Sequence, residues 1–180
     1  MDANAFYQSL VQKCTTHQPE GYGAVYTRAI YQVLYEIGID AGFCVNCKPF
    51  EHLASPVGDR EVMTIDFMYF AQKFAPDGYT YSPPEVVIEH ENEWEFQPKL
   101  DDFWKATLFI SPLRVFIGYA KDKDTAVEHA ARLTEAYREY GMRQLAGAET
   151  LILISWNDAN QCEWIARSLA GSGSEWRVLE

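Results

Sequence analysis

Apolar side chains recur at helical spacing in two stretches of the N-terminal part of the chain. They are Phe6, Leu10 and Cys14 within residues 4–14, and Tyr26, Ile30, Val33, Leu34 and Ile37 within residues 24–37. Intervals of three and four residues place side chains on one face of a helix, and Gly38 is a typical residue after a helix end. The pattern predicts a short helix over residues 4–14 and a longer one over 24–37.

Three stretches that follow have the character of β-strands. Residues 43–50 alternate apolar and polar side chains, residues 61–70 are rich in β-branched and aromatic side chains, and residues 85–92 are apolar on both faces. Alternation indicates a half-buried strand, whereas a continuous apolar run indicates a buried central one. Glycine and proline at 56–59 predict a turn, and the prolines within 76–84 predict an extended loop.

The rest of the chain alternates predicted helices and strands. The predicted elements are a helix over residues 98–110, a strand over 114–119, a helix over 125–141, a strand over 149–158, a helix over 162–171 and an edge strand over 175–180. Thr125 and Glu128 have the spacing of a capping box, which predicts a helix start at Thr125. Alternation of this kind favours parallel strands, so the sequence predicts an α/β fold with a mixed central sheet flanked by helices.

The composition is that of one compact domain. Of the 180 residues, 48% are hydrophobic and 14% aromatic, enough for a single core, so one domain is expected over 1–180. No run approaches the roughly 18 apolar residues of a membrane span, and we expect a cytoplasmic protein without a membrane partner. The cysteine pair Cys44 and Cys47 lacks the second pair that a structural zinc site needs, which favours reduced cysteines.

Acidic residues interrupt two of the predicted strands. Glu89 and Glu91 are two positions apart and therefore project from one face of the third strand, while Asp66 stands among apolar neighbours in the second. Buried carboxylates close together are costly unless a cation compensates them. The pattern predicts that Asp66, Glu89 and Glu91 converge on a divalent metal ion.

Mg²⁺ or Mn²⁺ is the ion expected at such a site. Mg²⁺ usually takes only one or two protein carboxylates, so Asp66 and Glu89 suffice for one ion. The alternative is that Glu89 and Glu91 lie at a strand end, where they face solvent or pair with a basic residue. His90, on the opposite face of the strand, is expected to be a hydrogen-bonded core histidine.

With these acids and this order of elements, the chain resembles the PD-(D/E)xK nuclease superfamily over residues 24–119. The resemblance implies a restriction-endonuclease-like three-layer fold, with an αβββαβ core over about 24–119 and a C-terminal αβα extension over about 120–180. The superfamily carries an acid on the second strand, an acid-x-Lys pair on the third and often a glutamate on the first helix.

Carried over by position, the resemblance implies that Asp66 and Glu89 hold the metal and that Glu36 is the optional helix ligand. Glu91 departs from the pattern, because it stands where the superfamily usually has the lysine that positions or deprotonates the attacking water. Some members use a second glutamate there, which makes Glu91 a candidate ligand or base. Others move the lysine to the following helix, where Lys105 is the candidate. The alternatives are a solvated Glu36 and an exposed Lys105 beside neighbouring acids.

The resemblance implies a Mg²⁺-dependent phosphodiesterase that acts on DNA. The formal net charge of −11 counts against nonspecific nucleic-acid binding, because Lys and Arg supply that affinity. A protein partner could supply the missing basic surface, and a homodimer is compatible with the sequence. The acidic charge also favours two alternatives: a catalytically inactive nuclease-fold protein that serves as an assembly or regulatory subunit, or an acidic mimic of nucleic acid.

Overall fold

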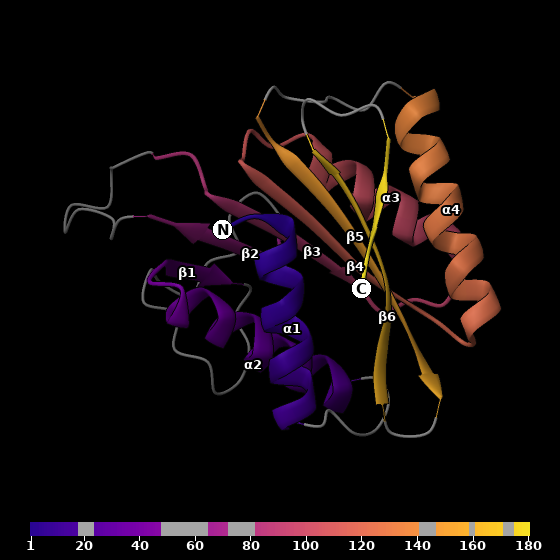
Figure 1. The fold of residues 1–180 in the computed structure, drawn as a ribbon, viewed down its shortest axis with the longest axis horizontal. Helices are drawn as coiled ribbons and strands as arrows, with labels where there is room; N and C mark the ends of the chain where they lie inside the picture. Colours follow the sequence, from indigo (N-terminus) through magenta and orange to yellow (C-terminus); the bar gives the residue numbers. More distant parts are fainter. Residues whose placement is uncertain (18–23, 48–64, 72–81, 141–146, 159–160, 171–174) are drawn as a thin grey trace.

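A computed structural model describes residues 1–17, 24–47, 65–71, 82–140, 147–158, 161–170 and 175–180 (Figure 1). Within these ranges the helices are α1 (Ala3–His17), α2 (Ala24–Asp40), α3 (Phe96–Thr107) and α4 (Lys123–Glu139). The strands are β1 (Cys44–Cys47), β2 (Phe67–Phe70), β3 (Val86–Glu91), β4 (Leu113–Ala120), β5 (Glu149–Asp158), β6 (Gln161–Ala170) and β7 (Arg177–Leu179).

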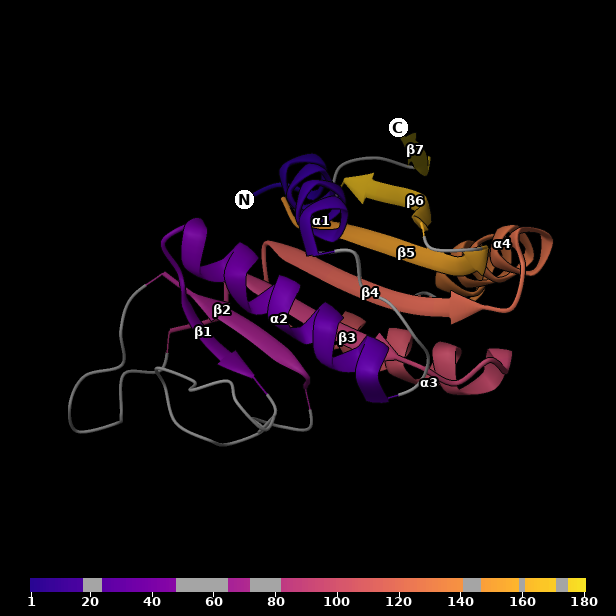
Figure 2. The same ribbon diagram turned by 90° about the horizontal axis from the view of Figure 1, so that it is seen from below.

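The strands form one mixed sheet in which β1 to β7 lie side by side in chain order. β1, β2 and β3 are antiparallel neighbours, β3, β4 and β5 are parallel, and β6 and β7 are antiparallel again. Parallel neighbours need a crossover connection, and α3 and α4 provide the two crossovers. The first two helices cover one face of the sheet and the last two the other, which gives three layers (Figure 2).

Apolar clusters on both faces of the sheet hold the layers together. Successive side chains of a strand point to opposite faces, and β4 shows this alternation clearly. Val115 and Ile117 pack with the core under α1 and α2, whereas Phe116 packs with Phe103 and the core under α3 and α4. Every residue of β4 is buried, as expected for a central parallel strand.

The structure confirms the α/β class, the mixed central sheet and the flanking helices. The order α2-β1-β2-β3-α3-β4 is the αβββαβ order expected over residues 24–119. The predicted turn at 56–59 lies outside the described residues, as does most of the loop predicted over 76–84. In the described part of the chain, no helix is both long enough and apolar enough to cross a membrane.

The helix predicted over residues 162–171 is wrong, because this segment is strand β6. Trp164, Ile165 and Leu169 have the spacing of a helix face, but they also fit a strand that is buried on both sides. In the structure Trp164 packs with the core under α1 and α2, and Ile165 and Leu169 with the opposite core. Pairing with β5 along the whole length of the strand decides between the two patterns. The C-terminal part is therefore αβββ and not αβα.

The predicted start of α4 at Thr125 is also wrong. The helix begins at Lys123, and its N-cap is Asp122, whose Oδ1 accepts a hydrogen bond from the Thr125 backbone N–H at 2.8 Å. Aspartate is as good an N-cap as threonine. Thr125 is thus the third residue of the helix. Its backbone N–H donates to the N-cap side chain, and Thr125 is not itself the N-cap.

The Gly38→Ala substitution should destabilise the fold. A Cβ at Gly38 would overlap Cγ2 of Val45 and lie 3.0 Å from Cε1 of Tyr69. Overpacking of this kind costs about 1–3 kcal/mol, which exceeds the gain of at most about 1 kcal/mol from alanine in a helix. Urea unfolding should show a lower midpoint for this variant. Val25→Ala, at a position 65% exposed in the same helix, should change the midpoint little, and equal midpoints would contradict the packing argument.

Candidate functional site

The pairing of β2 with β3 brings Asp66 and Glu89 together. Phe67, the first residue of β2, pairs with Ile88 in an antiparallel register, so Asp66, directly before the strand, lies near Glu89, and its charge acts on the Glu89 carboxyl group. Residues opposite each other across antiparallel strands are close neighbours. The side chains of Asp66 and Glu89 are 5% and 1% exposed, and the residues around them in β2 and β3 are mainly apolar. The structure thus brings together the two acids that the sequence marked as ligands.

Lys105 of α3 provides a positive charge beside this pair. Its Nζ lies 3.0 Å from Oε1 of Glu89 and 3.1 Å from Oδ1 of Asp102. Burial alone would lower the pKa of Lys105, but the negative charges of Glu89 and Asp102 raise it above its ordinary value. Lys105 is therefore a cation at neutral pH, and it is the lysine that the sequence placed on the helix after the third strand.

Glu89 is poorly compensated despite its contact with Lys105. Among the described residues, no hydrogen-bond donor meets its second oxygen, Oε2. Burial, followed by the nearby charge of Asp66, raises the pKa of Glu89 from 4.5 to about 9, although Lys105 opposes this shift. A carboxyl group at this position carries its proton at neutral pH unless more positive charge arrives.

Asp66 is held by donors from two elements. Its Oδ2 accepts the backbone N–H of His90 at 3.0 Å, and the hydroxyl of Tyr31, in α2, donates to the same carboxylate. Charge-assisted bonds of this kind stabilise an ionised carboxylate. The two acids therefore differ, because Asp66 has donors and Glu89 faces mainly apolar surroundings.

Glu91 does not join Asp66 and Glu89. Its Oε1 accepts the backbone N–H of Glu93 at 2.8 Å, and burial together with the neighbouring Asp102 raises its pKa. Within the described ranges, no three His, Cys, Asp or Glu side chains gather in a way that could hold a metal ion. The predicted convergence of three carboxylates is therefore wrong. Alternation gives Glu91 the same face as Glu89, but it lies at the end of β3 and is held by the backbone that follows.

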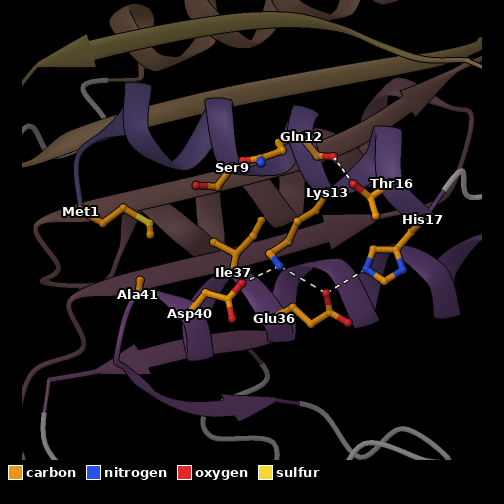
Figure 3. A pocket seen from close by; sticks show the side chains of 10 residues that line it. All are labelled: Met1, Ser9, Gln12, Lys13, Thr16, His17, Glu36, Ile37, Asp40 and Ala41. Carbon is orange, nitrogen blue, oxygen red and sulfur yellow. Dashed lines mark hydrogen bonds and ion pairs between the residues drawn. The ribbon is translucent and has the colours of Figure 1, made fainter.

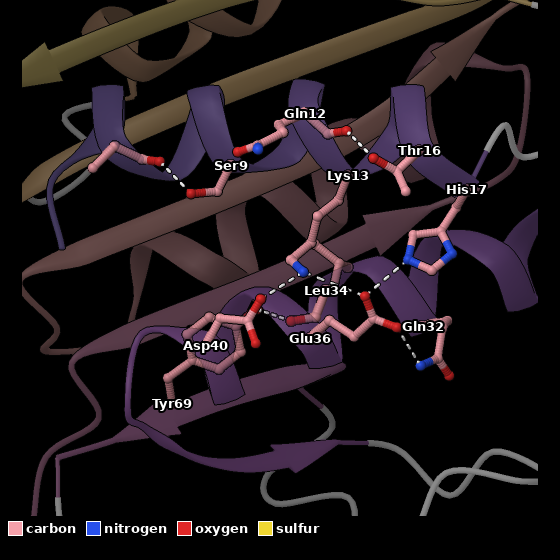
Figure 4. Close-up of polar contacts among 11 residues, drawn as sticks. Ser9, Gln12, Lys13, Thr16, His17, Gln32, Leu34, Glu36, Asp40 and Tyr69 are labelled. Carbon is pink, nitrogen blue, oxygen red and sulfur yellow. Dashed lines mark hydrogen bonds and ion pairs between the residues drawn. The ribbon is translucent and has the colours of Figure 1, made fainter.

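The predicted helix ligand Glu36 also lies elsewhere. It lines a polar cavity of about 380 Å³ between α1 and α2 (Figure 3). Its carboxylate lies 3.3 Å from Nζ of Lys13 and 2.8 Å from Nε2 of His17, and accepts a hydrogen bond from Gln32 (Figure 4). Tyr31, five positions earlier and roughly 140° away around the helix, is the residue of α2 that reaches Asp66. Glu36 is thus an α1–α2 contact and not a ligand.

His90 is a core histidine, as the sequence predicted. Its Nε2 lies 2.8 Å from the hydroxyl of Tyr119, and burial lowers its pKa to about 3, so the ring is neutral. The cysteines Cys44 and Cys47 lie buried in β1, and neither forms a disulfide bond among the described residues. Neither the His90 ring nor the two cysteines would therefore bind a metal ion together with Asp66 and Glu89.

Sequence reasoning missed Tyr31 and Asp102 as parts of the site. Asp102 could have been found, because it precedes Lys105 by three positions and so lies on the same helix face. Tyr31 gave no such signal, since a tyrosine in an apolar helix is usually a core residue.

No protein-family model, no curated protein and no solved structure matches the chain. The function proposed for the protein therefore depends on the contacts of the site.

The raised pKa of Glu89 predicts that the metal-free protein loses stability as the pH rises. Between pH 4.5 and about 9 the folded protein keeps the Glu89 proton, while the unfolded chain has released it. Folding then binds the extra proton, so the free energy of unfolding should fall with pH by up to about 1.4 kcal/mol per unit. Below pH 4.5 both states are protonated, and the contribution is fully present.

The check is urea unfolding in a chelating buffer at pH 5.5, 7 and 8.5. Glu89→Gln keeps the shape of the neutral side chain and cannot ionise, so its stability should fall less steeply than that of the wild type. Glu128→Gln, at a side chain 62% exposed, should keep the wild-type slope. Equal slopes for Glu89→Gln and the wild type would show that Glu89 ionises normally.

Proposed function

We propose that the protein is a Mg²⁺- or Mn²⁺-dependent phosphodiesterase that acts on DNA and has a restriction-endonuclease-like fold. One observation carries the proposal: Asp66, directly before β2, lies close enough to Glu89 of β3 for its charge to act on that carboxyl group, and Lys105 of the next helix lies 3.0 Å from Glu89. This set corresponds to the acids and the displaced lysine that the resemblance to the nuclease superfamily implies. The αβββαβ order of the elements supports it.

The chemistry of the pair fits a hard divalent cation. Two carboxylates are the usual protein contribution to a Mg²⁺ site, and the remaining positions are filled by water and substrate phosphate. Glu89 has an oxygen without a donor among the described residues and a raised pKa, and a cation would relieve both. Asp66 and Glu89 are therefore the residues that would hold the ion.

The ion, when bound, would polarise a phosphate diester and make a water molecule a better nucleophile. A cation held by Asp66 and Glu89 would neutralise the charge of Glu89. Lys105 would then be available to balance negative charge on the phosphate. Oδ1 of Asp102 lies 3.1 Å from the ammonium of Lys105 and helps to hold this group beside Glu89. Glu91 has its Oε1 bound to the backbone and is assigned no catalytic step.

A second candidate is a nuclease-fold protein without catalysis that acts as an assembly or regulatory subunit. The observation that favours it is the lack of a three-ligand group among the described residues, together with the net charge of −11. This candidate requires that the protein bind neither Mg²⁺ nor Mn²⁺. Metal binding therefore separates the two functions.

Purified protein with Mg²⁺ or Mn²⁺ should cleave plasmid or single-stranded DNA, and a chelator should stop the reaction. Asp66→Asn and Glu89→Gln should each lower the rate at least about a hundredfold, because each removes one of the two charges that hold the ion. Glu128→Gln removes a distant carboxylate and should keep wild-type activity. DNA cleavage by Asp66→Asn at the wild-type rate would contradict the proposal. A wild-type protein that neither cleaves DNA nor binds metal would favour the second candidate.

Lys105→Met should separate metal binding from cleavage. Removal of the ammonium that competes for Glu89 should leave Mn²⁺ affinity unchanged or higher in calorimetric titrations. The rate of DNA cleavage at saturating Mn²⁺ should nevertheless fall at least about tenfold, since the phosphate loses its charge partner. A variant that cleaves DNA at the wild-type rate would remove Lys105 from the mechanism.

A further inference from the structure

Tyr31 of α2 is the side chain that connects the first helical layer to the proposed cation site. It is 5% exposed, and its ring packs edge-on against two residues of the sheet. The ring centroids lie 4.9 Å from that of Phe67 and 5.3 Å from that of His90. Phe67 follows Asp66 in the chain, so these contacts hold the Tyr31 ring near the strand ends that carry the two acids, within hydrogen-bond reach of Asp66.

The hydroxyl of Tyr31 donates a hydrogen bond to the Asp66 carboxylate. The second donor is the backbone N–H of His90, at 3.0 Å from Oδ2. The backbone donor belongs to β3, and the ring of His90 is itself held by Tyr119 at 2.8 Å. The two donors together leave the carboxylate little freedom to rotate.

We propose that Tyr31 is a positioning residue that holds the Asp66 carboxylate in the orientation needed to bind the cation together with Glu89. The inference rests on the proposed function. Hydrogen bonds from a second layer of residues orient metal-binding groups, and their loss commonly costs about 10–100-fold in metal affinity. Orientation of Asp66 matters here because Oε2 of Glu89 has no hydrogen-bond donor within the described residues. Asp66 is the acid of the pair whose carboxylate is held by hydrogen bonds.

A matched pair of variants separates positioning from stability. Tyr31→Phe removes the hydroxyl and keeps the ring. Tyr69→Phe makes the same change at another buried tyrosine, whose hydroxyl donates to the carbonyl of Leu34, 2.5 Å away and on the α2 side of the sheet (Figure 4). Both variants lose one buried hydrogen bond, and only Tyr31→Phe loses one to Asp66.

The measurement is calorimetric titration with Mn²⁺, without DNA, at a temperature at which circular dichroism shows both variants folded. We expect a dissociation constant at least about tenfold higher for Tyr31→Phe. Tyr69→Phe should stay within about twofold of the wild type. In DNA cleavage, Tyr31→Phe should need at least about tenfold more Mn²⁺ for half-maximal rate and should approach the wild-type rate at saturation.

The outcomes distinguish the two proposals. Wild-type protein that binds no Mn²⁺ overturns the proposed function and the role of Tyr31 with it. Wild-type binding with equal dissociation constants for the two variants overturns the role of Tyr31 alone. Equal weakening in both variants assigns Tyr31 a purely structural role and also overturns the inference.

Discussion

The burial of Glu89 beside Asp66 is the constraint on which the surrounding structure depends. Two acids on adjacent strands, both at most 5% exposed, need donors and positive charge, and different elements supply them. β3 donates a backbone N–H, α2 donates the Tyr31 hydroxyl and α3 supplies the ammonium of Lys105. The site therefore exists only when the sheet and the helices on both of its faces are assembled.

α3 must be placed accurately for Lys105 to reach Glu89, and buried cations fix both of its ends. Nζ of Lys99 donates to the carbonyls of Glu93 and Glu95, just before the helix. Nη1 of Arg114, at the start of β4, donates to the carbonyl of Thr107 at 3.1 Å. Lysine and arginine are rarely buried completely, yet here both bind backbone carbonyls. That of Thr107 belongs to the last turn of α3, where carbonyls have no partner within the helix.

The sequence predicted the parts of the site that follow from local pattern. Asp66 and Glu89 stood out because acids interrupt apolar strands, whereas Lys105 was implied only by the resemblance to the nuclease superfamily. Glu91 was misplaced because alternation gives the face of a strand but not which part of that face meets the rest of the fold, and Glu36 was carried over from the resemblance alone. β6 was predicted as a helix because the spacing of its own residues does not show that the segment pairs with β5. Long-range pairing also set the proximity of Asp66 and Glu89, which their positions in the sequence did not reveal.

The net charge of −11 bears on how such a site could hold DNA. Lys99 and Arg114 are buried and bound to backbone carbonyls, so they cannot neutralise phosphates. Lys13 is occupied by Glu36 and by Asp40 at 2.6 Å. Broad electrostatic affinity for phosphates needs many free basic groups, and these three are not among them. A buried ion pair is also weak support for stability, since apolar residues of similar size often serve as well. The contact between Lys105 and Glu89 therefore carries little weight as an explanation of the protein's stability.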